Sequence, residues 1–166
     1  MRVGEAIGLN GADVDLGAGV ITIRVAKFDR SRLVPLHPSV TEALSRYLTS
    51  RDRLCPRPAS TAFFLSAAGT RLQGSGVDKT LRKITTSIGI RTATVHPRAH
   101  DLRHSFAVAT LIGWMRSGAN VDEHMAALST YLGHVSPADT YWYLSASPEL
   151  MALAAERLDA RFGTGR

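Results

Sequence analysis

His100-Asp101-Leu102-Arg103-His104-Ser105-Phe106-Ala107 begins an apolar helix and carries two side chains that suit a phosphate group, His100 and Arg103. Residues three apart on a helix share a face, so both side chains point the same way. The apolar positions expected to anchor this helix in a core are Phe106, Val108, Leu111, Ile112 and Trp114. The stretch therefore predicts a rigid pair of basic groups that grips a phosphate.

The composition favours an anionic partner. The chain has 166 residues, the length of one domain, and 45% of them are hydrophobic, which is enough for a globular core. It holds 20 Lys and Arg against 14 Asp and Glu, a formal net charge of +6. A basic excess suits nucleic acid, although it is also common in proteins that bind nothing anionic.

Cysteine usage and hydropathy indicate where the protein resides. Cys55 is the single cysteine, which excludes an intrachain disulfide and a cysteine metal cluster. No apolar run reaches the length of a membrane span, and the first residues lack the pattern of a secretory signal. These features predict a soluble protein of the cytoplasm with no membrane partner.

A β-hairpin is expected near the N-terminus. Residues 20–25 are rich in β-branched side chains, residues 33–36 form the returning strand, and Pro35 confines that strand to an edge or an end. Residues 13–16 are expected as a short edge strand. The basic side chains on and beside the turn are Arg24, Lys27, Arg30 and Arg32. They suit a DNA backbone or groove, and a solvated turn is the alternative.

The rest of the chain is predicted to be mainly helical, so the fold class is α+β with a small antiparallel sheet of about three strands. Ser39 is expected to cap a helix that runs to about Arg51, because Glu42 follows it at the capping-box spacing. Further helical patterns cover residues 2–9, 77–88, 121–132, 136–143 and 148–158. Ile84 is expected to face inward.

The last of these helices is amphipathic. Its apolar side carries Leu150, Leu153 and Leu158. This side packs either on the chain's own core or on a neighbouring copy.

An ordered set of residues resembles the catalytic domain of the tyrosine recombinases, the phage integrase family. Arg2-Val3-Gly4-Glu5-Ala6 resembles the box that holds the family's first arginine. The hairpin resembles the segment that holds its catalytic lysine, here Lys27, and Arg32-Leu33-Val34-Pro35-Leu36 resembles the usual continuation.

The second part of the resemblance lies downstream. His100-Asp101-Leu102-Arg103-His104 matches the family's His-x-x-Arg box, and Leu132-Gly133-His134 matches its second histidine box. Tyr143 follows at the family's customary distance, and Tyr141 is the competing tyrosine. The resemblance therefore covers nearly the whole chain, and its register favours Tyr143.

The resemblance implies a catalytic role for each member of the set. Tyr143 attacks phosphorus and forms a 3′-phosphotyrosine link, while Arg2 and Arg103 donate hydrogen bonds to the non-bridging oxygens. His100 acts as a base or a charge-balancing donor, and His134 donates to the phosphate. Lys27 protonates the leaving 5′-oxygen. The resemblance implies no metal and no other cofactor, because the arginines supply the positive charge.

The implied function is site-specific DNA recombination or integration by an enzyme of a mobile element. The expected partners are double-stranded DNA and further copies of the chain, in a tetramer on DNA. Because the sequence begins at the first arginine box, residues 1–166 are expected to be one catalytic domain. This domain lacks the first helices and the N-terminal DNA-binding domain of the family.

Three alternatives remain open. A DNA-binding remnant would keep the phosphate site without cutting, and a type IB topoisomerase would share the chemistry without a specific target sequence. His100 and His104 have the spacing of a helical zinc site, but the Glu of a His-Glu-x-x-His motif is absent. A metal hydrolase is therefore disfavoured.

Overall fold

The structure is a computed structural model that describes residues 1–25, 30–134, 136, 138–145 and 147–162. The chain divides into two compact units. The N-terminal unit is Arg2–Pro97, and the C-terminal unit is Arg98–Arg166 together with Met1. The mainly helical content and the small sheet confirm the predicted fold class. The prediction that both units form one catalytic domain stays a prediction.

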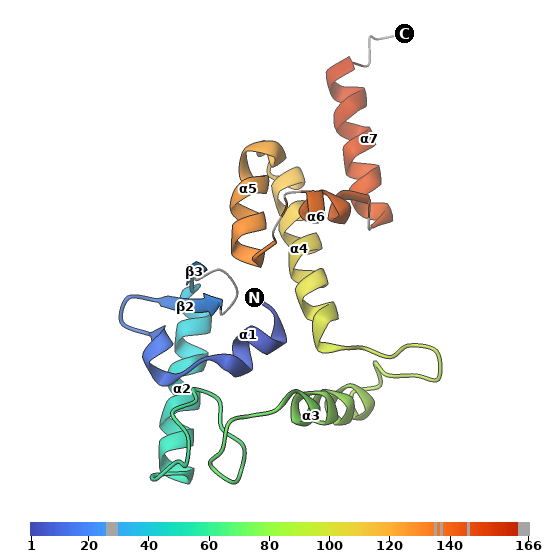
Figure 1. The fold of residues 1–166 in the computed structure, drawn as a ribbon. Helices are drawn as coiled ribbons and strands as arrows, with labels where there is room; N and C mark the ends of the chain where they lie inside the picture. The colour runs from blue at the N-terminus through green and yellow to red at the C-terminus, as the bar shows by residue number, and fades with distance from the viewer. Residues whose placement is uncertain (26–29, 135, 137, 146, 163–166) are drawn as a thin grey trace. The chain divides into compact units, whose positions relative to one another are not determined.

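The N-terminal unit contains the sheet. Its elements are α1 (Val3–Gly8), the 3-10 turn η1 (Gly11–Asp13), β1 (Val14–Asp15), β2 (Val20–Val25), β3 (Arg30–Pro35), α2 (Pro38–Leu54) and α3 (Gly74–Ser87) (Figure 1). The strands are antiparallel in the order β1-β2-β3, with Ile21 opposite Val34 and Ile23 opposite Arg32. Ile21, Ile23 and Val34 are buried. The predicted hairpin is therefore confirmed, and its returning strand begins three residues earlier than expected.

Two sequence expectations for this unit are wrong. The cap of α2 is His37, whose Nδ1 accepts the backbone N–H of Ser39, and Pro38 occupies the first helical position. Proline suits that position because it lacks an N–H to be satisfied there. In α3, Ile84 is half exposed and Thr85 is buried in its place. The burial leaves no unsatisfied polar group, because the Thr85 hydroxyl donates to a carbonyl of its own helix.

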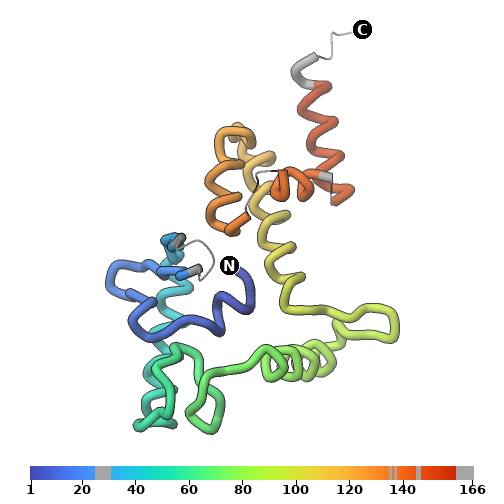
Figure 2. The backbone as a smooth tube through the Cα atoms, viewed as in Figure 1, coloured from blue at the N-terminus to red at the C-terminus, as the bar shows by residue number. Residues whose placement is uncertain are grey.

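In its described residues, the C-terminal unit contains helices and connecting turns but no strand. Its elements are α4 (Ala99–Arg116), α5 (Val121–Leu132), α6 (Ala138–Tyr141), the 3-10 turn η2 (Trp142–Ser145) and α7 (Pro148–Phe162) (Figure 2). Helices α5 and α7 both pack against α4. The buried core consists of Ala107, Leu111, Val121, Met125, Leu128, Leu132, Tyr143 and Leu150.

The buried stripe of α4 differs from the predicted one. Arg103, Ala107 and Leu111 follow one another every four residues and are all buried, so they share the inward face. Phe106 lies beside that stripe, is 45% exposed, and stacks on Tyr131 at a centroid distance of 5.5 Å. The expectation that Phe106 anchors the core is therefore wrong.

The packed side of α7 is shorter than expected. Leu150 is fully buried and Leu153 is partly buried, whereas Leu158 is 58% exposed. None of the helices in the described part of the chain is long and apolar enough to cross a membrane.

Candidate active site

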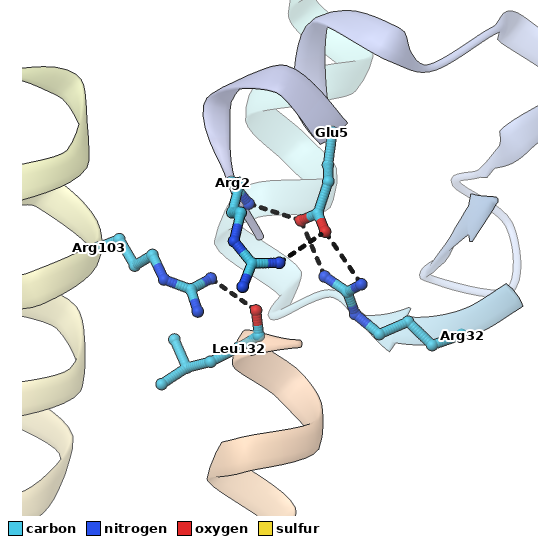
Figure 3. A network of polar contacts seen from close by, with 5 residues as sticks. All are labelled: Arg2, Glu5, Arg32, Arg103 and Leu132. Atoms are coloured by element: carbon cyan, nitrogen blue, oxygen red, sulfur yellow. Dashed lines mark hydrogen bonds and ion pairs between the residues drawn. The ribbon is translucent and has the colours of Figure 1, made fainter. Parts of the chain in front are cut away.

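Arg103 is buried in the C-terminal unit, on the inward face of α4. Only 7% of the residue is exposed, and its Nη1 donates to the carbonyl oxygen of Leu132 at 2.6 Å (Figure 3). Leu132 ends α5, and the last carbonyls of a helix have no partner within the helix. The guanidinium is therefore held by the backbone carbonyl two residues before His134.

His134 is fixed through both its backbone and its ring. Gly133 ends α5 in the left-handed conformation, with φ of 75°, which glycine adopts at little cost. The backbone N–H of His134 then donates to the Ser129 carbonyl at 3.0 Å. On the ring, Nδ1 lies 2.7 Å from the hydroxyl oxygen of Thr140, which is completely buried.

Tyr143 lies beside His134 in the same unit. The two rings are nearly parallel, with an interplanar angle of 12° and a centroid distance of 6.0 Å. His104 packs against the tyrosine ring at 5.2 Å, and the tyrosine is only 4% exposed. This unit thus brings Arg103, His134 and Tyr143 to one end of α5.

Tyr141, the competing tyrosine, has a different setting. It is 43% exposed, and its hydroxyl donates to Asp122 at the start of α5, at 3.4 Å. The opposite end of α5 carries Gly133 and His134. The structure therefore places Tyr143 beside His134, and it places the Tyr141 hydroxyl beside Asp122; the assignment of the nucleophile stays a prediction.

His100 is exposed in the first turn of α4, three residues before Arg103. The start of this helix is fixed by Asp101, whose carboxylate accepts the backbone N–H of Arg98 at 2.8 Å. The acid also complements the positive end of the helix. An exposed histidine at a fixed helix start is accessible to a substrate.

Arg2 belongs to the N-terminal unit, where it shares Glu5 with Arg32. The backbone N–H of Arg2 donates to Glu5 Oε2 at 2.6 Å, and its guanidinium lies 3.5 Å from Oε1. Arg32 donates from both terminal nitrogens to the same carboxylate, at 3.1 and 2.8 Å (Figure 3). Glu5 therefore ties the first turn of α1 to strand β3.

The Glu5 carboxylate is stabilised in its charged form. Burial raises its pKa, but hydrogen bonds from Arg32 and from the Arg2 backbone, together with the charge of Arg32, outweigh that effect. The net pKa lies below the ordinary value of 4.5. Bidentate pairs of arginine and carboxylate are among the stronger polar contacts in proteins, so this link is expected to be rigid at neutral pH.

The basic hairpin residues differ in their settings. Arg24 donates from Nε to Asp13 at 2.6 Å, yet 70% of its side chain stays exposed. The side chain of Arg32 is 16% exposed and is bound to Glu5. Lys27 and the side chain of Arg30 lie outside the described residues. The DNA contacts expected of Arg24, Arg30 and Arg32 stay predictions.

Four residues that support the site were not found from the sequence: Glu5, Arg71, His104 and Thr140. Arg71 donates from Nη1 to the carbonyls of Ile7 and Leu9, at 2.8 and 3.1 Å, and so holds the end of α1. Of the four, only Glu5 had a local signal, because it stands three residues after Arg2 at the capping-box spacing. Across the residues that the structure describes, no three His, Cys, Asp or Glu side chains gather as a metal site.

The sequence matches the Phage integrase family over residues 1–149. It is 45% identical over 165 residues to y4rB of Sinorhizobium fredii (strain NBRC 101917 / NGR234), which carries the provisional name integrase/recombinase. That match covers 98% of this chain and 52% of y4rB. The tyrosine recombinase XerC of Rhodospirillum centenum (strain ATCC 51521 / SW) is 33% identical over 149 residues, which is 90% of this chain and 40% of XerC.

Solved structures of recombinases have a similar fold. The crystal structure of XerA recombinase aligns with a TM-score of 0.73 and 26% identity, over 97% of this chain and 53% of XerA. XerH site-specific recombinase, in a post-cleavage complex with its palindromic difH substrate, aligns with a TM-score of 0.68 and 27% identity. That match covers 93% of this chain and 41% of XerH. The chain thus spans about half the length of the relatives it matches.

Proposed function

This chain belongs to the phage integrase family, and on that premise we propose that it is the catalytic part of a site-specific DNA recombinase or integrase. It would cut and rejoin DNA through a 3′-phosphotyrosine intermediate. The observation that carries the proposal is the cluster at the end of α5. There Tyr143 stacks on His134, and the Leu132 carbonyl holds Arg103.

The chemical step uses the tyrosine as nucleophile. The Tyr143 oxygen bonds to phosphorus while the bond from phosphorus to the 5′-oxygen breaks, and the tyrosine proton passes to His100. Lys27 gives a proton to the leaving 5′-oxygen. The phosphotyrosine link keeps the energy of the broken phosphodiester, so the reverse attack by a 5′-hydroxyl rejoins the strand with no external energy source.

Positive charge stabilises the transition state. Arg2, Arg103 and His134 donate hydrogen bonds to the non-bridging oxygens, where negative charge accumulates. Each such preorganised donor is worth about 10²–10³ in rate. The bidentate Glu5–Arg32 pair supports this role for Arg2, because it fixes the first turn of α1, which directly follows the arginine.

Double-stranded DNA is the proposed partner. The net charge of +6 suits a polyanion, and XerH, one of the structural relatives, is bound to its DNA substrate. We further propose that several copies of the chain assemble as a tetramer on DNA. Exchange of strands between two duplexes requires four cuts, and each cut uses one tyrosine.

A covalent adduct tests the proposal. The probe is a library of nicked DNA duplexes of randomised sequence, labelled at the 5′ end of the strand to be cut. A nick just beyond the cleavage site lets the short downstream piece leave, so the labelled strand stays on the protein. We expect a labelled band in a denaturing gel that is lost in Tyr143→Phe and retained in Tyr141→Phe, the matched control.

The other outcomes identify the alternatives. An adduct of equal yield in Tyr143→Phe contradicts the assignment of the nucleophile. Salt-dependent binding of the library with no adduct overturns the enzymatic proposal in favour of a DNA-binding remnant. Relaxation of a supercoiled plasmid of arbitrary sequence would instead indicate a type IB topoisomerase.

A further inference from the structure

We propose that Thr140 is a positioning residue that fixes the ring and the tautomer of His134. The inference rests on the proposed function, in which His134 donates a hydrogen bond to the phosphate. Its basis is the distance of 2.7 Å between the Thr140 hydroxyl oxygen and Nδ1 of His134. Thr140 is completely buried, so solvent does not compete for this hydrogen bond.

The hydroxyl of Thr140 has a different partner from the hydroxyls of three other helical threonines. The hydroxyls of Thr85, Thr110 and Thr130 all donate to the backbone carbonyl four residues earlier, which is the common arrangement for threonine in a helix. The Thr140 hydroxyl meets a histidine ring. A buried polar group paired with a side chain of the site indicates a role in orienting that side chain.

Other contacts restrict the backbone and the ring of His134. Its backbone follows the left-handed Gly133, and its N–H is bound to the Ser129 carbonyl. The Tyr143 ring lies nearly parallel to it. Because the backbone and one face of the ring are already in contact with other groups, the hydrogen bond at Nδ1 sets the rotation of the imidazole about the Cβ–Cγ bond.

A threonine hydroxyl can either donate to a bare Nδ1 or accept from a protonated one, and our proposal takes the first direction. In a neutral imidazole one nitrogen donates and the other accepts, and the partner of one nitrogen determines the tautomer. A hydroxyl that donates to Nδ1 leaves the proton on Nε2. The neutral ring then presents an N–H to a phosphate oxygen, which is the form that the proposed role of His134 requires.

Two substitutions separate this role from packing. Thr140→Val has nearly the same shape but no hydroxyl, and Thr140→Ser keeps the hydroxyl with one methyl group fewer. Thr130→Val is the matched control, because it removes an exposed hydroxyl of α5 that donates to a backbone carbonyl. Thermal unfolding establishes that each variant is folded at the temperature of the assays.

Nitrogen NMR of the histidine-labelled protein gives the direct readout, with His134→Gln to assign the signal. At a pH where the ring is neutral, we expect Nε2 protonated and Nδ1 unprotonated in the unsubstituted chain, Thr140→Ser and Thr130→Val. Thr140→Val should show both tautomers in exchange. A proton on Nδ1 in the unsubstituted chain, or an unchanged signal in Thr140→Val, overturns the inference.

The nicked-duplex assay gives the second readout. The rate of adduct formation should fall roughly 10- to 100-fold in Thr140→Val, as when a partner that orients a ligating histidine is removed, and should return with Thr140→Ser. If Thr140→Val forms the adduct as fast as the unsubstituted chain does, the inference about Thr140 is overturned and the proposed function is not. Absence of any adduct overturns the proposed function, and the NMR measurement then decides the inference.

Discussion

Glu5 is the residue that links Arg2 to the sheet, and its charge is expected to stabilise the fold. Its pKa is lowered in the folded state, so its contribution is fully present above the ordinary value of 4.5 and is lost as the pH falls through the lower folded value. We expect Glu5→Gln to lower the free energy of unfolding by about 1.5–3 kcal/mol at pH 7. The difference from the unsubstituted chain should shrink below pH 4.5.

Denaturant titrations at several pH values measure this difference. Glu42→Gln is the control, because Glu42 pairs with Arg46 on the exposed surface of α2 at 3.4 Å and should contribute little. If Glu5→Gln lowers the free energy of unfolding by the same amount at pH 7 and at pH 3, the proposed dependence of stability on the Glu5 charge is contradicted.

Arg24 and Arg46 give a test of the hairpin as a DNA contact. Both side chains are largely exposed and both are paired with a carboxylate, but only Arg24 lies on the hairpin. If Arg24 contacts a phosphate, Arg24→Gln should reduce the slope of log K against log salt by about one, whereas Arg46→Gln should leave it unchanged. Fluorescence anisotropy with a labelled duplex of random sequence, well below each variant's unfolding midpoint, measures the slopes. Equal slopes for the two variants would count against a hairpin contact.

At the scale of the residue, the sequence predicts candidate site residues, but it does not predict the residues that hold them in place. Arg103, His134 and Tyr143 stand in short local patterns, and the structure places them in one unit. The pairing of Glu5 with Arg32 spans 27 positions of sequence, so no local pattern contains it. Thr140 is near His134 in sequence, but its contact depends on how the chain turns between α5 and α6.

Elements are predictable where glycine and proline mark their ends. The sequence predicts both ends of α5, because Gly118 precedes it and Gly133 follows it, each with a positive φ in the structure. The burial of single positions is less predictable. Phe106 and Leu158 fit an apolar pattern but are exposed, because neighbouring helices cover only a narrow stripe of α4 and of α7.

A pair of glycine substitutions tests the end of α5. Gly133 has a φ of 75°, so Gly133→Ala should cost about 1–2 kcal/mol of stability by forcing a side chain into the left-handed region. Gly113 lies within α4, and a Cβ there would meet no atom within 4 Å. Gly113→Ala should therefore stabilise the protein by about 0.5–1 kcal/mol. Denaturant unfolding measures both changes, and a Gly133→Ala variant as stable as the parent would show that the helix end tolerates another conformation.

On the scale of the whole molecule, the structure shows two compact units, and the sequence predicts one catalytic domain. The proposed chemistry requires groups from both units, since Arg2 belongs to one and Arg103, His134 and Tyr143 to the other. No local pattern in the sequence reports how strongly two units depend on each other. That dependence is a property of the contacts made in the folded chain, and cooperativity of unfolding measures it.

The two tryptophans make this measurement specific to one unit. Trp114 and Trp142 both lie in the C-terminal unit, whereas Glu5 lies in the N-terminal unit. If the chain unfolds as one domain, Glu5→Gln should lower the midpoint seen by tryptophan fluorescence, by roughly 2–4 °C for each kcal/mol lost. Gly113→Ala, which lies in the same unit as the tryptophans, is the positive control and should raise it. Independent folding of the units would give a different result. The fluorescence midpoint would then respond to Gly113→Ala but not to Glu5→Gln, and circular dichroism would show a second transition that Glu5→Gln shifts.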